Sequence, residues 1–241
     1  MISLLKTSIF NMLPAQHRQM SILLYGDSNT WGFVPMGSVE SRLPTRIPYK
    51  QRWTTLLQEK LLTEHVIVEA LNARTTIFDD MCSPCDGEYD CNGRRYLTTL
   101  LHSHKPLKLI VLALGTNDLK QKFNTTPNDI VSGIRVLVRD IQRATLIGLG
   151  DESPKILVLG PPVIHSTNTS KMWGFIEGSD SKSKKLSSLL AVATADMKIN
   201  YLNLSTIASV SQLDGVHFDV TTQKSIADAV ATKVKPLLDY Y

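Results

Sequence analysis

A serine near the start of the chain stands where a nucleophile could act. Residues 21–25 form a short, mostly apolar run, long enough for one buried strand, which ends abruptly in Gly26, Asp27 and Ser28. Open α/β sheets bind their ligands at the carboxyl ends of such strands. Strands also end in Gly, Asp or Ser for reasons of turn geometry alone. Ser28 is therefore a candidate nucleophile whose assignment depends on partners elsewhere in the chain.

His217 and Asp214 could supply those partners. A serine hydroxyl is a poor nucleophile and needs an adjacent base, and histidine suits this because its pKa lies near neutrality. Asp214 stands three residues before His217, so one short segment could provide both the base and the carboxylate that orients it. Taken singly, Asp214 followed by Gly215 also fits a simple turn, and an isolated histidine is more often structural.

Acyl transfer also needs hydrogen-bond donors aimed at the developing oxyanion. Asn117 offers a side-chain NH2 group after the third predicted strand, and the backbone N–H groups of Ser28 and Ala73 follow the first and second. Asn117 could instead merely cap a helix. Turns alone do not easily explain three such blocks in order at predicted strand ends, so the residues together predict hydrolysis of an acyl bond.

Strands and helices must alternate along the chain to position these residues. Three prolines mark residues 33–51 as a long loop, of the kind that often forms part of a binding site. Five β-α units predict one parallel sheet with helices on both faces and right-handed crossovers. The predicted strands are 21–25, 66–71, 107–114, 155–159 and 201–204, and the predicted helices are 52–62, 94–104, 127–141, 183–197 and 221–238. Thr126 is the expected N-cap of the third helix.

Aromatic residues near the blocks are candidates for a substrate pocket. Trp31 follows the candidate nucleophile closely, while Trp173 and Phe175 lie in residues 163–180, which are predicted to be irregular. We expect Trp31 and Phe175 to line the pocket. Ordinary core packing is the alternative for Trp173 and Phe175.

Length and composition predict one globular domain over residues 21–241. The chain has 241 residues, of which 43% are hydrophobic, enough for a substantial single core. Residues 1–20 have a broken apolar stretch without a clear cleavage site, so they make a poor secretory signal. We expect a disordered leader, or translation from Met12 or Met20, and a cytoplasmic protein, although secretion is not excluded.

Charge and hydropathy argue against two classes of partner. The net charge is +4 and the basic residues are scattered, whereas a nucleic-acid surface needs a denser basic stripe. No apolar run approaches the roughly 18 residues that span a bilayer. A nucleotide-binding function is disfavoured as well, because Asp27 would repel a phosphate after the first strand.

The cysteines lie close together at Cys82, Cys85 and Cys91. A C-x2-C pair suggests zinc or redox chemistry, but no second pair completes four ligands. We therefore expect a loop with free thiols, or with one opportunistic disulfide, and no metal site. We also expect no cofactor.

Taken together, the blocks resemble the SGNH (GDSL-type) hydrolase family. The resemblance extends from about Ile22 to the carboxyl end and is closest to the arylesterase and acyltransferase branch. The segments that carry it are residues 26–35 (Gly-Asp-Ser-Asn-Thr-Trp-Gly-Phe-Val-Pro), 73–76, 114–118, 161–162 and 214–218.

This resemblance implies a flavodoxin-like three-layer α/β/α sandwich with a five-stranded parallel sheet of order 2-1-3-4-5. It implies that Ser28 is the nucleophile, that His217 is the general base and acid, and that Asp214 orients His217. The Ser28 and Ala73 N–H groups and the Asn117 side chain would form the oxyanion hole.

Two residues depart from the family pattern. The family commonly has glycine where this chain has Ala73, and leucine where it has Asn29. Alanine still provides a backbone donor, while the contacts of Asn29 are left open. The resemblance also implies that Asp27 is structural and hydrogen-bonds nearby backbone.

The predicted function is hydrolysis of small acyl or aryl esters through an acyl-serine intermediate, with acyl transfer to alcohols as a further activity. The partner is then a small-molecule ester, and a homo-oligomer is left open. Alternatives are a carbohydrate O-acetylesterase and a lysophospholipase. A rival from another class is a catalytically silent binding protein of the same fold, against which the intact set of candidate residues speaks.

Overall fold

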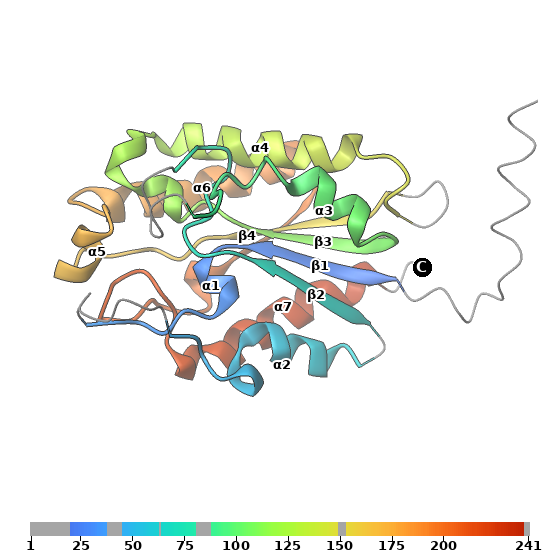
Figure 1. Ribbon diagram of the computed structural model, residues 1–241, viewed down its shortest axis with the longest axis horizontal. Coiled ribbons are helices and arrows are strands. Elements are labelled where there is room, and N and C mark those ends of the chain that lie inside the picture. The colour runs from blue at the N-terminus through green and yellow to red at the C-terminus, as the bar shows by residue number, and fades with distance from the viewer. Residues whose placement is uncertain (1–19, 38–44, 63, 81–87, 149–152, 239–241) are drawn as a thin grey trace, which may run out of the picture.

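A parallel sheet lies between two layers of helices (Figure 1). The computed structural model describes residues 20–37, 45–62, 64–80, 88–148 and 153–238. The strand order is β2-β1-β3-β4-β5 and every neighbouring pair is parallel, which confirms the predicted fold class. The strands are β1 Ser21–Gly26, β2 His65–Ala70, β3 Leu107–Ala113, β4 Lys155–Gly160 and β5 Asn200–Asn203.

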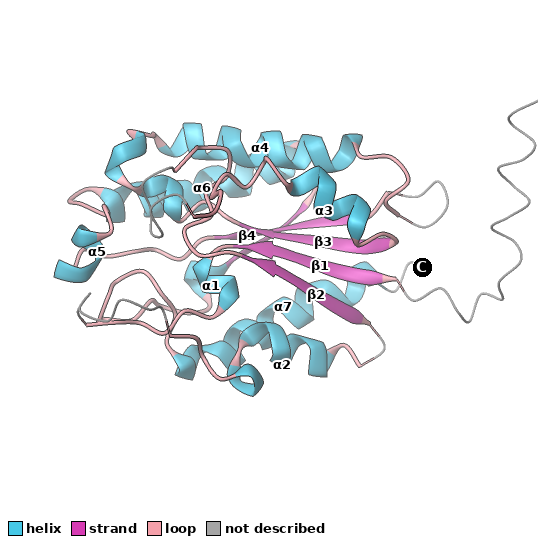
Figure 2. Ribbon diagram, in the orientation of Figure 1, coloured by secondary structure: helices cyan, strands magenta, loops and turns pink. Residues whose placement is uncertain are grey.

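The helices divide between the two faces of the sheet, as Figure 2 shows in cyan. Helices α3, α4 and α6 cover one face, and α2 and α7 cover the other (Figure 1). The short helices α1 and α5 lie toward one end of the sheet. The bounds are α1 Ser28–Trp31, α2 Trp53–Lys60, α3 Leu97–Ser103, α4 Pro127–Arg143, α5 Asn168–Met172, α6 Ser179–Asp196 and α7 Gln223–Leu238.

Strand β3 shows why the sheet is buried on both sides. Successive side chains of a strand point to opposite faces. Ile110 and Leu112 therefore belong to the cluster under α4 and α6, whereas Leu109 and Val111 belong to the cluster under α2 and α7. All four are fully buried, which accounts for the near-continuous apolar run of this strand.

Helix α1 was not expected from the sequence. It is one turn long and starts at Ser28, directly after β1 and Asp27. The Asp27 side chain caps it by accepting a hydrogen bond from the Asn29 N–H, and Gly32 ends it in a left-handed conformation. The turn between β1 and the expected loop is thus a rigid helical turn rather than irregular chain.

The largest further differences from the prediction lie after β4. The segment predicted to be irregular contains α5, and α6 begins at Ser179 rather than at Ser183. A capping box between Thr167 and Ser170 starts α5. Gly178, with a φ of 91°, precedes α6. The first residues of this helix are polar, so no apolar periodicity in the sequence revealed where it starts.

Parts of the sequence predictions lie outside the described residues. These are residues 1–19 of the predicted leader, residues 38–44 of the predicted loop 33–51, and Cys82 and Cys85. Cys91 is described, and its thiol is buried and forms no disulfide. Within the described ranges, no helix is both long and apolar enough to cross a membrane.

Helix α4 approaches the turn after β2 very closely. The predicted N-cap Thr126 starts this helix in a capping box with Asp129. One turn further on, Gly133 packs against the Thr76 side chain, and a Cβ at Gly133 would collide with Thr76 Oγ1. Thr76 cannot easily move aside because its hydroxyl is hydrogen-bonded to Asp118.

We predict that Gly133→Ala destabilises the fold by about 1–3 kcal/mol, because overpacking outweighs the better helix propensity of alanine. Ser132→Ala, on the exposed side of the same helix, is the matched control and should leave stability almost unchanged. Urea unfolding followed by circular dichroism measures both. A G133A protein as stable as the wild type would mean that α4 and the turn are not held together as described.

Candidate active site

Two distant segments meet at the carboxyl edge of the sheet, and three of their side chains form one hydrogen-bonded chain. Ser28 Oγ lies 2.9 Å from His217 Nε2, and His217 Nδ1 lies 2.9 Å from Asp214 Oδ2. Ser28 and His217 are 5% exposed, and Asp214 is fully buried. With Asp214 accepting the proton on Nδ1, Nε2 is left to accept the Ser28 hydroxyl. The arrangement can therefore take a proton from Ser28 as its oxygen attacks an electrophile.

The loop of Asp214 and His217 is organised around the carboxylate itself. Asp214 Oδ1 accepts the backbone N–H groups of Val216 and His217, both at 2.9 Å, and Oδ2 also accepts that of Met36 at 3.3 Å. Burial by itself would raise the pKa of Asp214, but the hydrogen bonds and charge of His217 and the backbone donors together lower it. Asp214 thus stays ionised and fixes the ring of His217.

The three candidate donors for an oxyanion follow β1, β2 and β3 in the chain. The backbone N–H groups of Ser28 and Ala73 donate to no acceptor among the described residues. Asn117 donates one N–H of its amide to Arg74 O at 3.1 Å, which fixes the side chain. The second N–H of this amide has no acceptor in the part of the chain that the structure describes. Asn117 lies in a short 3-10 turn after β3, next to the segment after β2 that carries Ala73.

Ala73 holds an unusual backbone conformation, with a φ of 63°. Residues with a Cβ avoid this left-handed region, and glycine does not. The conformation gives a physical reason for the glycine that the family commonly has here. The sequence reveals that alanine replaces the family's glycine at residue 73, but it does not reveal the left-handed backbone conformation there.

Asp118 ties the two donor segments together, a role that the sequence did not reveal. Its carboxylate accepts the Thr76 N–H at 3.0 and 3.1 Å and also the Thr76 hydroxyl. Complete burial raises the pKa of Asp118 to about 6, against the partial compensation by Thr76. Burial likewise raises the pKa of Asp27 to about 6, and Asp27 accepts the Asn29 N–H. These two carboxylates act within the fold and do not reach His217 by a hydrogen bond.

The aromatic residues beside His217 are Trp173, a candidate from the sequence, and Phe33, which was not a candidate. Phe33 stacks on the His217 ring, with centroids 4.2 Å apart, and Trp173 meets the ring edge-on at 5.3 Å. The ring centroids of Trp31 and Phe33 are 6.5 Å apart, so Trp31 lies next to Phe33 and not next to His217. Phe175 is 2% exposed and belongs to the core, which is the alternative stated for it. The sequence offered no signal for Phe33, because its contact depends on the path of the chain after α1.

The comparisons with known proteins agree with this geometry. Residues 24–223 match the GDSL-like lipase/acylhydrolase family, and this range includes every residue of the site. The chain belongs to this family. It is an esterase of the SGNH type. No curated protein matches the chain.

Solved structures of similar esterases share the whole SGNH fold with this chain. The aryl esterase of M. smegmatis is 34% identical and has a TM-score of 0.81, covering 91% of this chain and 100% of its own. A carbohydrate acetylesterase from Sinorhizobium meliloti is 37% identical with the same TM-score of 0.81 and the same two coverages, 91% and 100%. A putative arylesterase from Agrobacterium tumefaciens is 31% identical, with a TM-score of 0.78 and coverages of 91% and 100%.

No group of three or more His, Cys, Asp or Glu residues within the described ranges could hold a metal ion. The buried carboxylates of Asp27, Asp118 and Asp214 accept the hydrogen bonds described above.

We predict that Ala73→Gly keeps full esterase activity and changes stability by less than about 1 kcal/mol. Glycine relieves the left-handed strain but gains entropy in the unfolded chain, and it retains the N–H group. Ala73→Val, with a branched Cβ in the same conformation, should lose stability and activity together. The measurements are kcat/KM on an aryl acetate and thermal unfolding. A large loss of activity in A73G would show that the site needs the methyl group rather than the backbone donor.

We predict that Asp118→Asn stabilises the protein more at pH 7 than at pH 4. The folded-state pKa of about 6 lies above the unfolded value of 3.8, so ionisation of Asp118 makes the fold progressively less stable between these two pH values. The amide removes that loss, and the gain should differ by up to about 3 kcal/mol between the two pH values. Urea unfolding of both proteins at each pH tests this, and an equal difference at the two pH values would contradict it.

Proposed function

We propose that the protein hydrolyses small acyl or aryl esters through an acyl-Ser28 intermediate. The observation that carries the proposal is the hydrogen-bonded chain from Ser28 Oγ through His217 to Asp214, with both distances at 2.9 Å. Similarity to an aryl esterase supports the substrate class. In the proposed roles, Ser28 is the nucleophile, His217 the general base and acid, and Asp214 the residue that orients His217.

In the first step, Ser28 Oγ attacks the ester carbonyl carbon while His217 Nε2 takes its proton. The negative charge moves to the carbonyl oxygen, where the N–H groups of Ser28 and Ala73 and the Asn117 amide would stabilise it. The intermediate then collapses, the bond to the leaving oxygen breaks, and His217 returns its proton to the departing alcohol. The acyl group remains on Ser28.

In the second step, water attacks the acyl carbonyl and His217 again acts as base and then as acid. The carboxylic acid leaves and Ser28 regains its proton. An alcohol in place of water would give a new ester by the same route, which is the proposed transferase activity. The rings of Phe33 and Trp173 beside His217 support this transferase activity, because they offer apolar surface to the carbon chain of an alcohol.

A carbohydrate O-acetylesterase is the second candidate. Similarity to a carbohydrate acetylesterase at 37% identity favours it, and the same three side chains would serve. The two functions differ in the alcohol that leaves, a phenol or a sugar hydroxyl. We further propose that residues 21–241 form one catalytic domain, because the described elements from β1 to α7 surround a single sheet.

We predict that Ser28→Ala lowers kcat/KM on p-nitrophenyl acetate by about 10⁴-fold or more, because the nucleophile is lost while the fold is kept. Ser132→Ala, an exposed serine, is the control and should match the wild type. A fluorophosphonate should add once to the wild type and S132A and not to S28A, as read by intact mass. Equal hydrolysis by wild type and S28A would refute the assignment.

The same preparations decide between the two substrate classes. The wild type is compared on p-nitrophenyl acetate, p-nitrophenyl butyrate and a peracetylated sugar, with acetate release as the common readout. A higher kcat/KM on the phenyl esters is the expected result. A higher value on the sugar would make the carbohydrate acetylesterase the better description.

A further inference from the structure

We propose that Asn29 is a positioning residue that holds the loop of His217 against the nucleophile helix. This inference rests on the proposed function of Ser28 and His217 and adds a residue that has no part in the acyl-transfer steps. Asn29 is 8% exposed and follows Ser28 directly in α1. Its side chain bonds the backbone on both sides of His217.

The two bonds of the Asn29 amide straddle His217. Asn29 Nδ2 donates to Val216 O at 3.2 Å, and Asn29 Oδ1 accepts the Phe218 N–H at 3.1 Å. The orientation of the amide is fixed by its partners, because a carbonyl can only accept and a backbone N–H can only donate. The Asn29 side chain in α1 therefore makes one donated and one accepted hydrogen bond with the backbone of the His217 loop.

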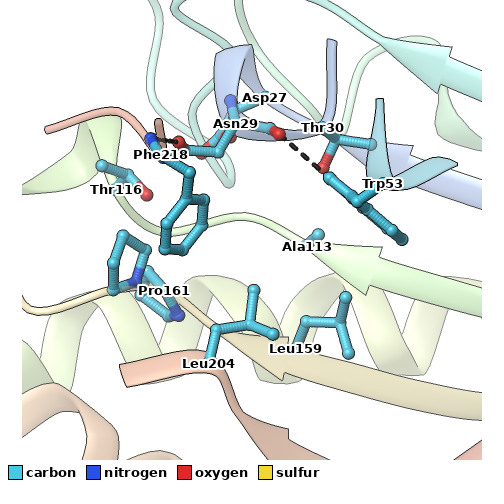
Figure 3. A pocket seen from close by; sticks show the side chains of 11 residues that line it. Asp27, Asn29, Thr30, Trp53, Ala113, Thr116, Leu159, Pro161, Leu204 and Phe218 are labelled. Carbon is cyan, nitrogen blue, oxygen red and sulfur yellow. Dashed lines mark hydrogen bonds between the residues drawn. The ribbon is translucent and has the colours of Figure 1, made fainter. Parts of the chain in front are cut away.

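Asn29 is itself held on the opposite side. Its N–H donates to Asp27 Oδ1 at 3.0 Å, and its carbonyl accepts Trp53 Nε1 at 3.1 Å. Figure 3 shows Asn29 close to Phe218 and Trp53 at the rim of a small cavity. The cavity has a volume of about 10 Å³, about the space of one water molecule, so the amide has little room to turn away.

Other hydrogen bonds of the His217 loop connect it to segments other than α1. Gly215 O accepts the His165 N–H at 2.9 Å, and Asp214 O accepts the Thr167 hydroxyl at 3.1 Å, so both bonds tie the loop to the segment after β4. Met36 N reaches Asp214 at 3.3 Å. Apart from the hydrogen bond between Ser28 and His217, the two hydrogen bonds of the Asn29 side chain are those that connect this loop to α1 among the described residues.

Leucine, the residue that the family commonly has at this position, could make neither bond. The Val216 carbonyl and the Phe218 N–H would then be buried without these partners, and His217 would be free to shift relative to Ser28. A displacement of about 1 Å in a catalytic group can cost 10²-fold in rate. The inference is therefore specific to this chain and its Asn29.

The test compares Asn29→Leu with the wild type and with Asn203→Leu. Asn203 is a control of the same residue type: its Oδ1 accepts the Ser205 N–H, the Ser205 hydroxyl and the Ser187 hydroxyl, and it lies at the end of β5. We expect N29L to lower kcat by about tenfold or more with KM within about threefold, and N203L to lose stability without losing kcat. N29L with kcat within twofold of the wild type would overturn the proposal, as would an equal loss in N203L.

Asn29→Asp adds a readout that a purely structural role would not move. A protonated carboxyl is isosteric with the amide and can still donate to Val216 O, whereas the carboxylate cannot. The charged groups around this position are Asp27, with Arg74 and Asp118 near it, together with Asp214 and His217, and the wild type shares all of them. We therefore expect the ratio of kcat in N29D to that in the wild type to fall as pH rises.

A flat ratio across the pH range would overturn the positioning role, even if N29L proved unable to fold. Failure of the proposed function would look different. In that case wild type and S28A would hydrolyse esters equally, so the activity compared at residue 29 would not depend on Ser28.

Discussion

The bond between Ser28 Oγ and His217 Nε2 is the contact on which the rest of the structure depends. It joins residues 189 positions apart at a distance of 2.9 Å. A hydrogen bond of this length tolerates errors of only a few tenths of an ångström. Both residues must therefore sit on elements that the sheet holds firmly. Ser28 begins a helical turn capped by Asp27, and His217 lies in a loop built around the buried carboxylate of Asp214.

The donor side of the site is held in a similar way and at a cost in stability. Asn117 bonds Arg74 O, and Asp118 bonds Thr76, so the segments after β2 and β3 form one unit. Part of that unit is strained or poorly solvated, because Ala73 is left-handed and Asp118 is buried with a raised pKa. Such local violations of good folding chemistry are typical of functional sites, where they are offset by the surrounding structure.

The sequence revealed the elements whose signals are local. The apolar run of β3, the Thr126 cap of α4 and the polar turns after strands each reflect a few consecutive residues, and the structure confirms the strands, the cap and the sheet order. The spacing of Asp214 and His217 also allowed their contact to be foreseen. The spacing could not give the distance from His217 to Ser28, because that distance depends on how the sheet brings together two segments 189 residues apart.

Contacts that depend on chain path could not be predicted. Phe33 covers His217 only because Gly32 turns the chain after α1. Phe175 lies between α5 and α6 in the chain and belongs to the same core cluster as Leu186 and Leu190 of α6. The two bonds from Asn29 to the His217 loop belong to the same class, since nothing at residue 29 alone points to residues 216 and 218.

The central claim is that Ser28 carries the acyl group during turnover. Rapid mixing of the wild type with p-nitrophenyl acetate, an acid quench within the first turnovers and peptide mass spectrometry would test it most directly. The account predicts one acetyl group on the peptide that contains Ser28, which disappears on longer incubation. Rapid release of p-nitrophenol with no acetylated Ser28 at any quench time would contradict the covalent mechanism.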